Sequence, residues 1–211
     1  MNTTLQKLMD TMGPLYKFEG TDVPLHHNTA GLSKSIDFET GLLLSNFVQW
    51  KKPETIVELG TFRGYSTAWL ILGSQLAGTH TLPCGHVHAF EVFKEGSYGS
   101  MWYDDLEMRL ENFTYHEVPK GIWNFPEEIP AAIDFIFHDT QHSLNPTIQE
   151  MNILLPRVPV GGMVLVDDML YPDYKPMQGY LNRLFTTSEL GVWKWTVLPI
   201  GHGLGIAERL K

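Results

Sequence analysis

Three aspartates in the second half of the chain have types and spacing that could hold a metal ion, and a histidine follows the first of them closely in the sequence. Asp139 and His142 follow one short apolar run, and Asp167 and Asp168 directly follow another. Three carboxylates that converge would repel one another and raise one another's pKa. A hard divalent cation removes that problem, and an all-oxygen ligand set suits Mg²⁺ better than zinc. We therefore expect a cation on the three aspartates; the alternative is that Asp167 or Asp168 only caps the following segment and no metal binds.

A glycine loop in the first half of the chain could bind the polar end of a small molecule. It reads Glu58-x-Gly60-x-x-x-Gly64, after an apolar run and before a helix-like run. Gly60 lets the backbone leave a strand without a Cβ clash, and Gly64 lets a ligand approach the main chain where the unpaired N–H groups of a helix start lie. The spacing matches neither a dinucleotide-binding turn nor a P-loop. The carboxylate of Glu58 suits a ligand with a cationic amino-acid end better than a pyrophosphate.

Glu91 ends another apolar run, about thirty residues beyond the glycine loop. An acid at this place in a nucleotide-binding α/β fold can accept hydrogen bonds from both ribose hydroxyls. Glu91 therefore predicts an adenosine-containing ligand without identifying which one. The glycine spacing argues against a nicotinamide dinucleotide.

Alternating strand-like and helix-like runs must position these residues. Strands are expected at 55–59, 86–91, 113–118, 132–138, 162–166, 193–198 and 204–208. Helices are expected at 42–50, 66–76, 101–112, 146–155 and 178–184. This order predicts an α/β fold, with a doubly wound, seven-stranded, mostly parallel Rossmann-like sheet and helices on both faces. The short connection 199–203 predicts a closing hairpin, so the C-terminal strand should run antiparallel. Such sheets bind ligands at the carboxyl ends of their strands, where all the acids named above fall.

Composition limits the function. The chain has 211 residues and a net charge of −9, which argues against a nucleic-acid partner because phosphate binding needs a basic face. The single cysteine, Cys84, fits a reducing compartment, and there is no signal-like start or membrane-length apolar run. We expect a cytoplasmic protein with one domain over residues 1–211, made of an N-terminal cap segment (1–35) and a core (36–211). Its partners should be a small molecule and, in a homo-oligomer, copies of itself.

Over roughly residues 36–168, the order and spacing of these motifs resemble the class I S-adenosylmethionine-dependent methyltransferases. The pair Asp139-x-x-His142 and Asp167-Asp168 resembles their cation-dependent O-methyltransferases of the catechol O-methyltransferase type, above all the bacterial relatives with an Asp-x-x-His motif. The resemblance implies that Asp139, Asp167 and Asp168 hold Mg²⁺ or a similar cation. It implies that S-adenosylmethionine contacts Glu58, Gly60, Thr61, Gly64, Ser66, Glu91 and Asp139.

The resemblance also implies a reaction, the transfer of a methyl group to a hydroxyl of a small molecule. His142 stands where the catechol enzymes have a lysine general base, and an imidazole with a pKa of about 6.5 can accept that proton. We therefore expect His142 to be the catalytic base; the alternative is a capping or surface histidine. Two other functions stay open, namely a methyltransferase of the same fold without a metal, and a catalytically silent subunit that binds S-adenosylmethionine.

Overall fold

The computed structural model describes residues 36–62, 64–78, 84–92, 111–187 and 190–211. Its strands are β1 (Thr55–Leu59), β2 (His86–Glu91), β3 (Phe113–Glu117), β4 (Phe135–His138), β5 (Met163–Val166), β6 (Trp193–Leu198) and β7 (Leu204–Arg209). Its helices are α2 (Phe38–Lys51), α3 (Tyr65–Ala77), α5 (Leu144–Leu154) and α6 (Lys175–Thr187), with short 3₁₀ helices η1 (Ile122–Asn124), η2 (Leu155–Arg157) and η3 (Pro172–Tyr174). The expected cap segment, and all but the last two residues of the helix expected at 101–112, lie outside the described residues.

The strands form one seven-stranded sheet in the order β3-β2-β1-β4-β5-β7-β6. The strands β1 to β5 pair in parallel, whereas β7 runs antiparallel to both of its neighbours, β5 and β6. The expected fold class and the expected antiparallel C-terminal strand are confirmed. The hairpin returns β7 between β5 and β6, so the start of β7 lies beside the end of β5.

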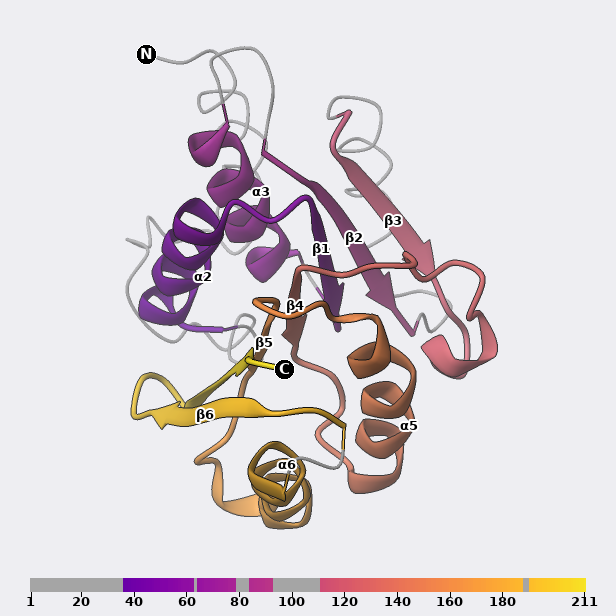
Figure 1. The fold of residues 1–211 in the computed structure, drawn as a ribbon, viewed down its shortest axis with the longest axis vertical. Coiled ribbons are helices and arrows are strands. Elements are labelled where there is room, and N and C mark those ends of the chain that lie inside the picture. The colour runs from indigo at the N-terminus through magenta and orange to yellow at the C-terminus, as the bar shows by residue number, and fades with distance from the viewer. Residues whose placement is uncertain (1–35, 63, 79–83, 93–110, 188–189) are drawn as a thin grey trace, which may run out of the picture.

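Helices cover both faces of the sheet (Figure 1). Apolar side chains of α2 and α3, such as Leu44 and Leu70, pack in one buried cluster, and those of α5 and α6, such as Met151 and Leu181, pack in another. Alternate residues of each inner strand contribute to the two clusters, so β4 and β5 are buried on both faces. Among the helices that the structure describes, none has the length and apolar character needed to cross a bilayer.

Several elements begin at other residues than expected, and a carboxylate lies at two of these starts. The N-terminus of α2 extends back to Phe38 because Asp37 caps it, with Oδ1 accepting a hydrogen bond of 2.7 Å from the N–H of Thr40. The ladder of β4 begins only at Phe135. Before it, the Asp134 carboxylate lies 3.0 Å from the N–H of Thr55.

The strand order reverses between β1 and β4, which are neighbours in space although two strands separate them in the chain. The residues after these strands therefore meet at the topological switch point, the usual ligand site of a doubly wound sheet. Here the N–H of Asp139 donates to the carbonyl of Leu59 at 2.9 Å, and the N–H of Asp167 donates to that of His138 at 3.0 Å. The ends of β1, β4 and β5 are thereby fixed side by side.

Candidate active site at the carboxyl ends of the strands

The glycine loop lies directly against the end of β4. Gly60 has a φ of +83°, and a Cβ there would lie 1.8 Å from the carbonyl oxygen of Asp139. Only glycine can therefore stand at this position without moving the Asp139 backbone. Gly64, with a φ of +76°, precedes α3 and leaves the first N–H groups of that helix without a side-chain cap.

The carboxyl group of Glu58 is buried beneath this loop. Its side chain is fully buried, and its Oε2 accepts a hydrogen bond of 2.5 Å from the hydroxyl of Thr67. Burial, reinforced by the nearby carboxylates of Asp139 and Glu91, raises the pKa of Glu58 to about 8. The hydroxyl of Ser66 is near enough to offset part of this rise in the pKa, but it makes no well-directed hydrogen bond, so Oε1 has no hydrogen-bond partner among the described residues. A buried carboxyl oxygen without a partner is costly, and a cationic or N–H-bearing ligand would satisfy it.

Glu91 organises the loop from the end of β2. Its Oε2 accepts a hydrogen bond of 2.7 Å from the N–H of Phe62 and lies 3.4 Å from the hydroxyl of Thr61. Thr61 and Ser66 are both buried, Ser66 in the first turn of α3. The structure therefore gathers the residues expected to bind the cofactor around one loop, and shows that Glu91 also holds the shape of that loop.

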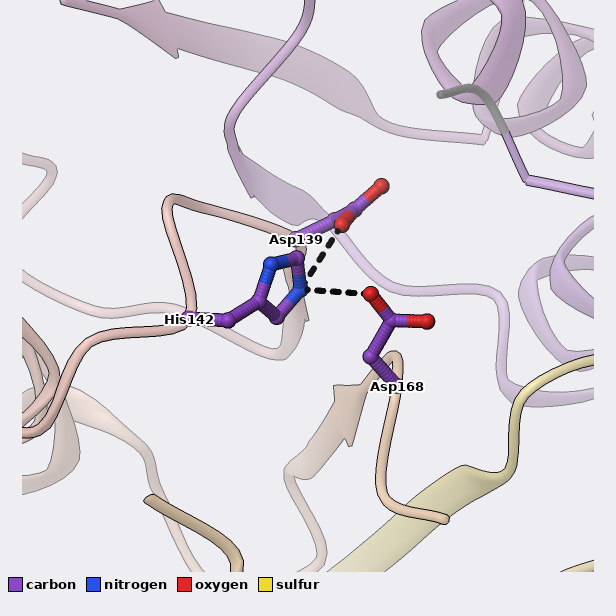
Figure 2. A group of neighbouring side chains, drawn as sticks. All are labelled: Asp139, His142 and Asp168. Carbon is purple, nitrogen blue, oxygen red and sulfur yellow. Dashed lines mark ion pairs between the residues drawn. The ribbon is translucent and has the colours of Figure 1, made fainter. Parts of the chain in front are cut away.

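Asp139, His142 and Asp168 form a second group, at the ends of β4 and β5 (Figure 2). The His142 ring points between the two carboxylates, with Nε2 at 3.2 Å from Oδ1 of Asp139 and at 3.3 Å from Oδ2 of Asp168. One ligand atom from each residue lies within 4.8 Å of the other two. Two oxygens and one nitrogen that converge in this way could hold a divalent cation.

The Nε2 atom of His142 faces two carboxylates without a directed hydrogen bond to either. The atom is buried and has no hydrogen-bond partner of acceptable direction, although both carboxylates lie within ion-pair distance. Nε2 and the two oxygens lie close enough together to serve as ligands of one ion. His142 therefore fits two roles, as a metal ligand or as a base paired with two acids.

Asp167 lies beside this group rather than within it. Its side chain is buried, and burial, followed by the charges of Asp139 and Asp168, raises its pKa well above the ordinary value. Among the described residues, the converging set contains Asp139, His142 and Asp168 but not Asp167. The structure thus brings two of the three expected metal ligands together, adds His142 to them, and leaves a ligand role for Asp167 as a prediction.

Backbone strain accompanies these residues. His142 has a φ of +54° and Asp168 a φ of +61°, values that residues other than glycine rarely adopt. Phe62, in the glycine loop, has a φ of +43°. Such conformations cost energy and cluster at functional sites, although Lys52 and Lys120 also have a positive φ away from this site, Lys52 as the C-cap of α2.

Three aromatic side chains lie near the group formed by Asp139, His142 and Asp168. Tyr174 stacks on the His142 ring, with centroids 4.5 Å apart, and Tyr171 stacks on Tyr174 at 4.8 Å. His202, in the hairpin before β7, places Nδ1 at 3.2 Å from Oδ1 of Asp168. No local signal in the sequence marked His202, because only the pairing of β7 with β5 brings the start of β7 beside Asp168.

Comparisons with known proteins agree with this arrangement. A family model described as a methyltransferase domain matches residues 57–169. An uncharacterized protein of Acanthamoeba polyphaga mimivirus is 25% identical over 122 residues, which are 57% of this chain and 53% of that protein. The chain thus spans about half the length of the curated relative that it matches.

Solved structures share the fold at low sequence identity. An O-methyltransferase from Bacillus cereus in complex with SAH has a TM-score of 0.66 at 17% identity, over 99% of this chain and 91% of that one. The O-methyltransferase from Streptomyces achromogenes involved in tomaymycin synthesis, in complex with SAM, has a TM-score of 0.64 at 18% identity, over 100% and 91%. A SAH-bound methyltransferase from Podospora anserina has a TM-score of 0.66 at 13% identity, over 98% and 97%. Because the domain model covers more than half of the sequence, including the glycine loop and the Asp139–Asp168 group, the chain belongs to the methyltransferase domain family.

Proposed function

We propose that this protein transfers the methyl group of S-adenosylmethionine to a hydroxyl of a small molecule, with a divalent cation at Asp139, His142 and Asp168. The observation that carries the proposal is the contact between two sites. The Asp139 carbonyl closes on Gly60 in the cofactor loop, while the Asp139 carboxylate belongs to the converging group. A methyl donor on the loop and an acceptor at the group would therefore be neighbours.

The loop offers groups that suit S-adenosylmethionine, the compound bound in the Streptomyces achromogenes structure. Glu58 has an unpaired buried oxygen that would accept from a cationic amino group. Glu91 stands at the end of β2, where an acid can accept the ribose hydroxyls. Ser66 and the uncapped N–H groups at the start of α3 offer donors for a carboxylate.

The acceptor site would be formed by the strained residues after β4 and β5. A bound divalent cation supplies a lowered pKa for a coordinated hydroxyl and fixes the direction of its oxygen. His142, stacked on Tyr174, would either ligate that cation or take the proton of the hydroxyl. With a nitrogen among the ligands, the site would also accept Mn²⁺ or Zn²⁺. The net charge of −9 supports a small-molecule acceptor over a nucleic acid.

A metal-independent methyltransferase is the second candidate. The observation in its favour is that His142 already lies within ion-pair distance of both Asp139 and Asp168. In that case His142, held between the two carboxylates, would act as the base without a cation.

Calorimetry with S-adenosylhomocysteine, in the presence of Mg²⁺ and in the presence of chelator, tests the proposal. We expect binding in both conditions, and methyl transfer to a hydroxylated acceptor only with the metal. Full activity in excess chelator would establish the metal-independent candidate. Absence of any S-adenosylhomocysteine binding would refute both.

A further inference from the structure

Glu150, in α5, is a buried carboxylate next to the candidate active site. Its side chain is 6% exposed, and the same face of α5 buries Met151 and Leu154. Its Oε2 lies 2.7 Å from Nε2 of His138, which is itself fully buried. The same oxygen accepts a hydrogen bond of 3.2 Å from the hydroxyl of Thr140.

The two partners of Glu150 flank Asp139 on either side in the chain. His138 is the last residue of β4, and Thr140 is the first residue after Asp139. One carboxylate oxygen therefore fixes both neighbours of Asp139, while the N–H of Asp139 is bonded to Leu59. Hydrogen bonds therefore fix the N–H of Asp139 and the side chains of both its neighbours in the chain. The Asp139 side chain is directed towards His142.

Stability alone does not explain this carboxylate. A charged or polar group buried against a helix face costs desolvation energy, and apolar residues of similar size often stabilise a core as well or better. The Nδ1 atom of His138 is also buried without a partner among the described residues. With a proton on Nε2, His138 would donate to Glu150, while Nδ1 has no partner among the described residues.

We propose that Glu150 is a positioning residue, which sets the direction of the Asp139 carboxylate by holding His138 and Thr140. The proposal rests on the proposed function in that Asp139 is taken as a cation ligand. Glu150 touches neither the acceptor nor the cofactor, and acts through the two residues that it binds. Outer residues that orient metal ligands typically change metal affinity or activity by 10–100-fold when they are replaced.

The test measures Mn²⁺ affinity of the full chain by calorimetry, with S-adenosylhomocysteine affinity as the second readout. Glu150→Ala should weaken Mn²⁺ binding by about 10–100-fold and retain S-adenosylhomocysteine binding. Glu150→Gln should restore most of the Mn²⁺ affinity, because the amide oxygen can accept from both donors. A folded Glu150→Ala protein with unchanged Mn²⁺ affinity would overturn the proposal.

Asn112→Ala is the matched control. Asn112 is also buried, and its amide donates two hydrogen bonds, to Ser74 and to Gly85, but at the amino ends of β2 and β3, away from Asp139. The Asn112→Ala variant should be less stable than the wild type but should bind Mn²⁺ with unchanged affinity. An equal loss of Mn²⁺ affinity in Asn112→Ala would mean that general destabilisation, and not positioning, explains the Glu150→Ala result.

A crystal structure of Glu150→Ala separates this proposal from the proposed function. If the wild-type protein binds no Mn²⁺, the cation part of the proposed function fails, but the position of Asp139 can still be measured. The distance from Oδ1 of Asp139 to Nε2 of His142, 3.2 Å here, should then exceed the ion-pair limit of about 4 Å. An unchanged distance would overturn the proposal. If Glu150→Ala does not fold, Thr140→Val removes one of the two hydrogen bonds, and the same two measurements decide.

Discussion

The Nε2 atom of His142 lies 3.3 Å from Oδ2 of Asp168, and both residues have a positive φ. This contact joins the segments that follow β4 and β5, on the side of β4 opposite to the β1 glycine loop. Two strained residues that meet through their polar atoms suggest a role that justifies the strain. A cation shared with Asp139 would provide such a role. It would attract the ligand atoms of His142 and Asp168, and that attraction would offset the cost of the strain.

Replacement of His142 distinguishes a ligand from a base. If Nε2 binds the cation, His142→Ala should weaken Mn²⁺ affinity by at least about tenfold, and higher pH should not restore activity. If His142 is the base, Mn²⁺ and cofactor binding should stay unchanged and the rate should fall by about 10²–10⁴-fold. That loss should shrink at higher pH, where the acceptor hydroxyl ionises without help. Calorimetry measures the Mn²⁺ and cofactor affinities, and pH–rate profiles measure the loss of activity and its dependence on pH.

Asp168→Asn provides the comparison for His142→Ala. It should lose most of the cation affinity in either case, while cofactor binding through the glycine loop persists. Wild-type cation affinity in Asp168→Asn would show that Asp139, His142 and Asp168 do not form the metal site.

Replacement of Gly60 should damage both sites together. In Gly60→Ala the new Cβ would lie 1.8 Å from the Asp139 carbonyl oxygen, at a φ of +83°. We expect a loss of stability of at least about 1–2 kcal/mol from the backbone conformation alone, and weaker binding of both S-adenosylhomocysteine and Mn²⁺. The damage therefore arises from the protein's own backbone as well as from lost space for a ligand. Urea denaturation and calorimetry measure these effects.

Gly179→Ala is the control for that variant. Gly179 lies in α6, and a Cβ there would contact nothing within 4 Å. Alanine should stabilise the helix by roughly 0.5–1 kcal/mol and leave both affinities unchanged. If Gly60→Ala kept both affinities as Gly179→Ala does, the close approach of Gly60 to Asp139 would have no functional meaning.

The sequence predicted the sheet because strand signals are local. Apolar runs buried on both faces, as in β4 and β5, are recognisable without any partner, and acids at their ends indicate a ligand edge. The same reasoning placed Asp139 and Asp168 at one edge. It could not exclude Asp167 from the converging group, because that depends on the turn at Asp168, whose φ of +61° is not encoded in a short local pattern.

Contacts between distant segments were harder to predict. His202 reaches Asp168 only because β7 inserts between β5 and β6, and strand order is a property of the whole sheet. Glu150 resembles an ordinary polar residue of an amphipathic helix until the pairing with His138 is seen. Side chains that act through tertiary contacts, and not through spacing in the chain, were therefore the ones missed.

Glu91 should contribute to cofactor binding in two ways. Its Oε2 accepts from the N–H of Phe62, and it stands at a strand end where an acid can accept ribose hydroxyls. Glu91→Gln should weaken S-adenosylhomocysteine binding by roughly 1.5–3 kcal/mol, the usual contribution of hydrogen bonds to a charged acceptor. Mn²⁺ affinity should not change, since Glu91 is not among the converging residues. If calorimetry shows normal S-adenosylhomocysteine binding in this variant, Glu91 does not take part in cofactor binding and is only a charged residue at the end of a strand.

Glu58 should make the stability of the protein depend on pH. Its pKa is raised from 4.5 to about 8 in the folded protein, chiefly by burial. Between those two values the folded state keeps a proton that the unfolded chain releases, so stability should fall as pH rises, by up to about 1.4 kcal/mol per pH unit. Above the folded pKa the decline should stop. Urea denaturation from pH 5 to pH 9 measures this slope.

Glu58→Gln separates this effect from that of Asp167, whose raised pKa acts in the same direction. The amide does not titrate, so the variant should show a smaller decline over the same range, and the difference between the two curves belongs to Glu58. A cationic ligand group bound at Glu58 would favour the carboxylate, so cofactor binding near pH 7 should release a proton from the wild type. Calorimetry in buffers with different heats of ionisation detects that proton. Equal proton release by the wild type and Glu58→Gln would show that the ligand's cationic end is bound elsewhere.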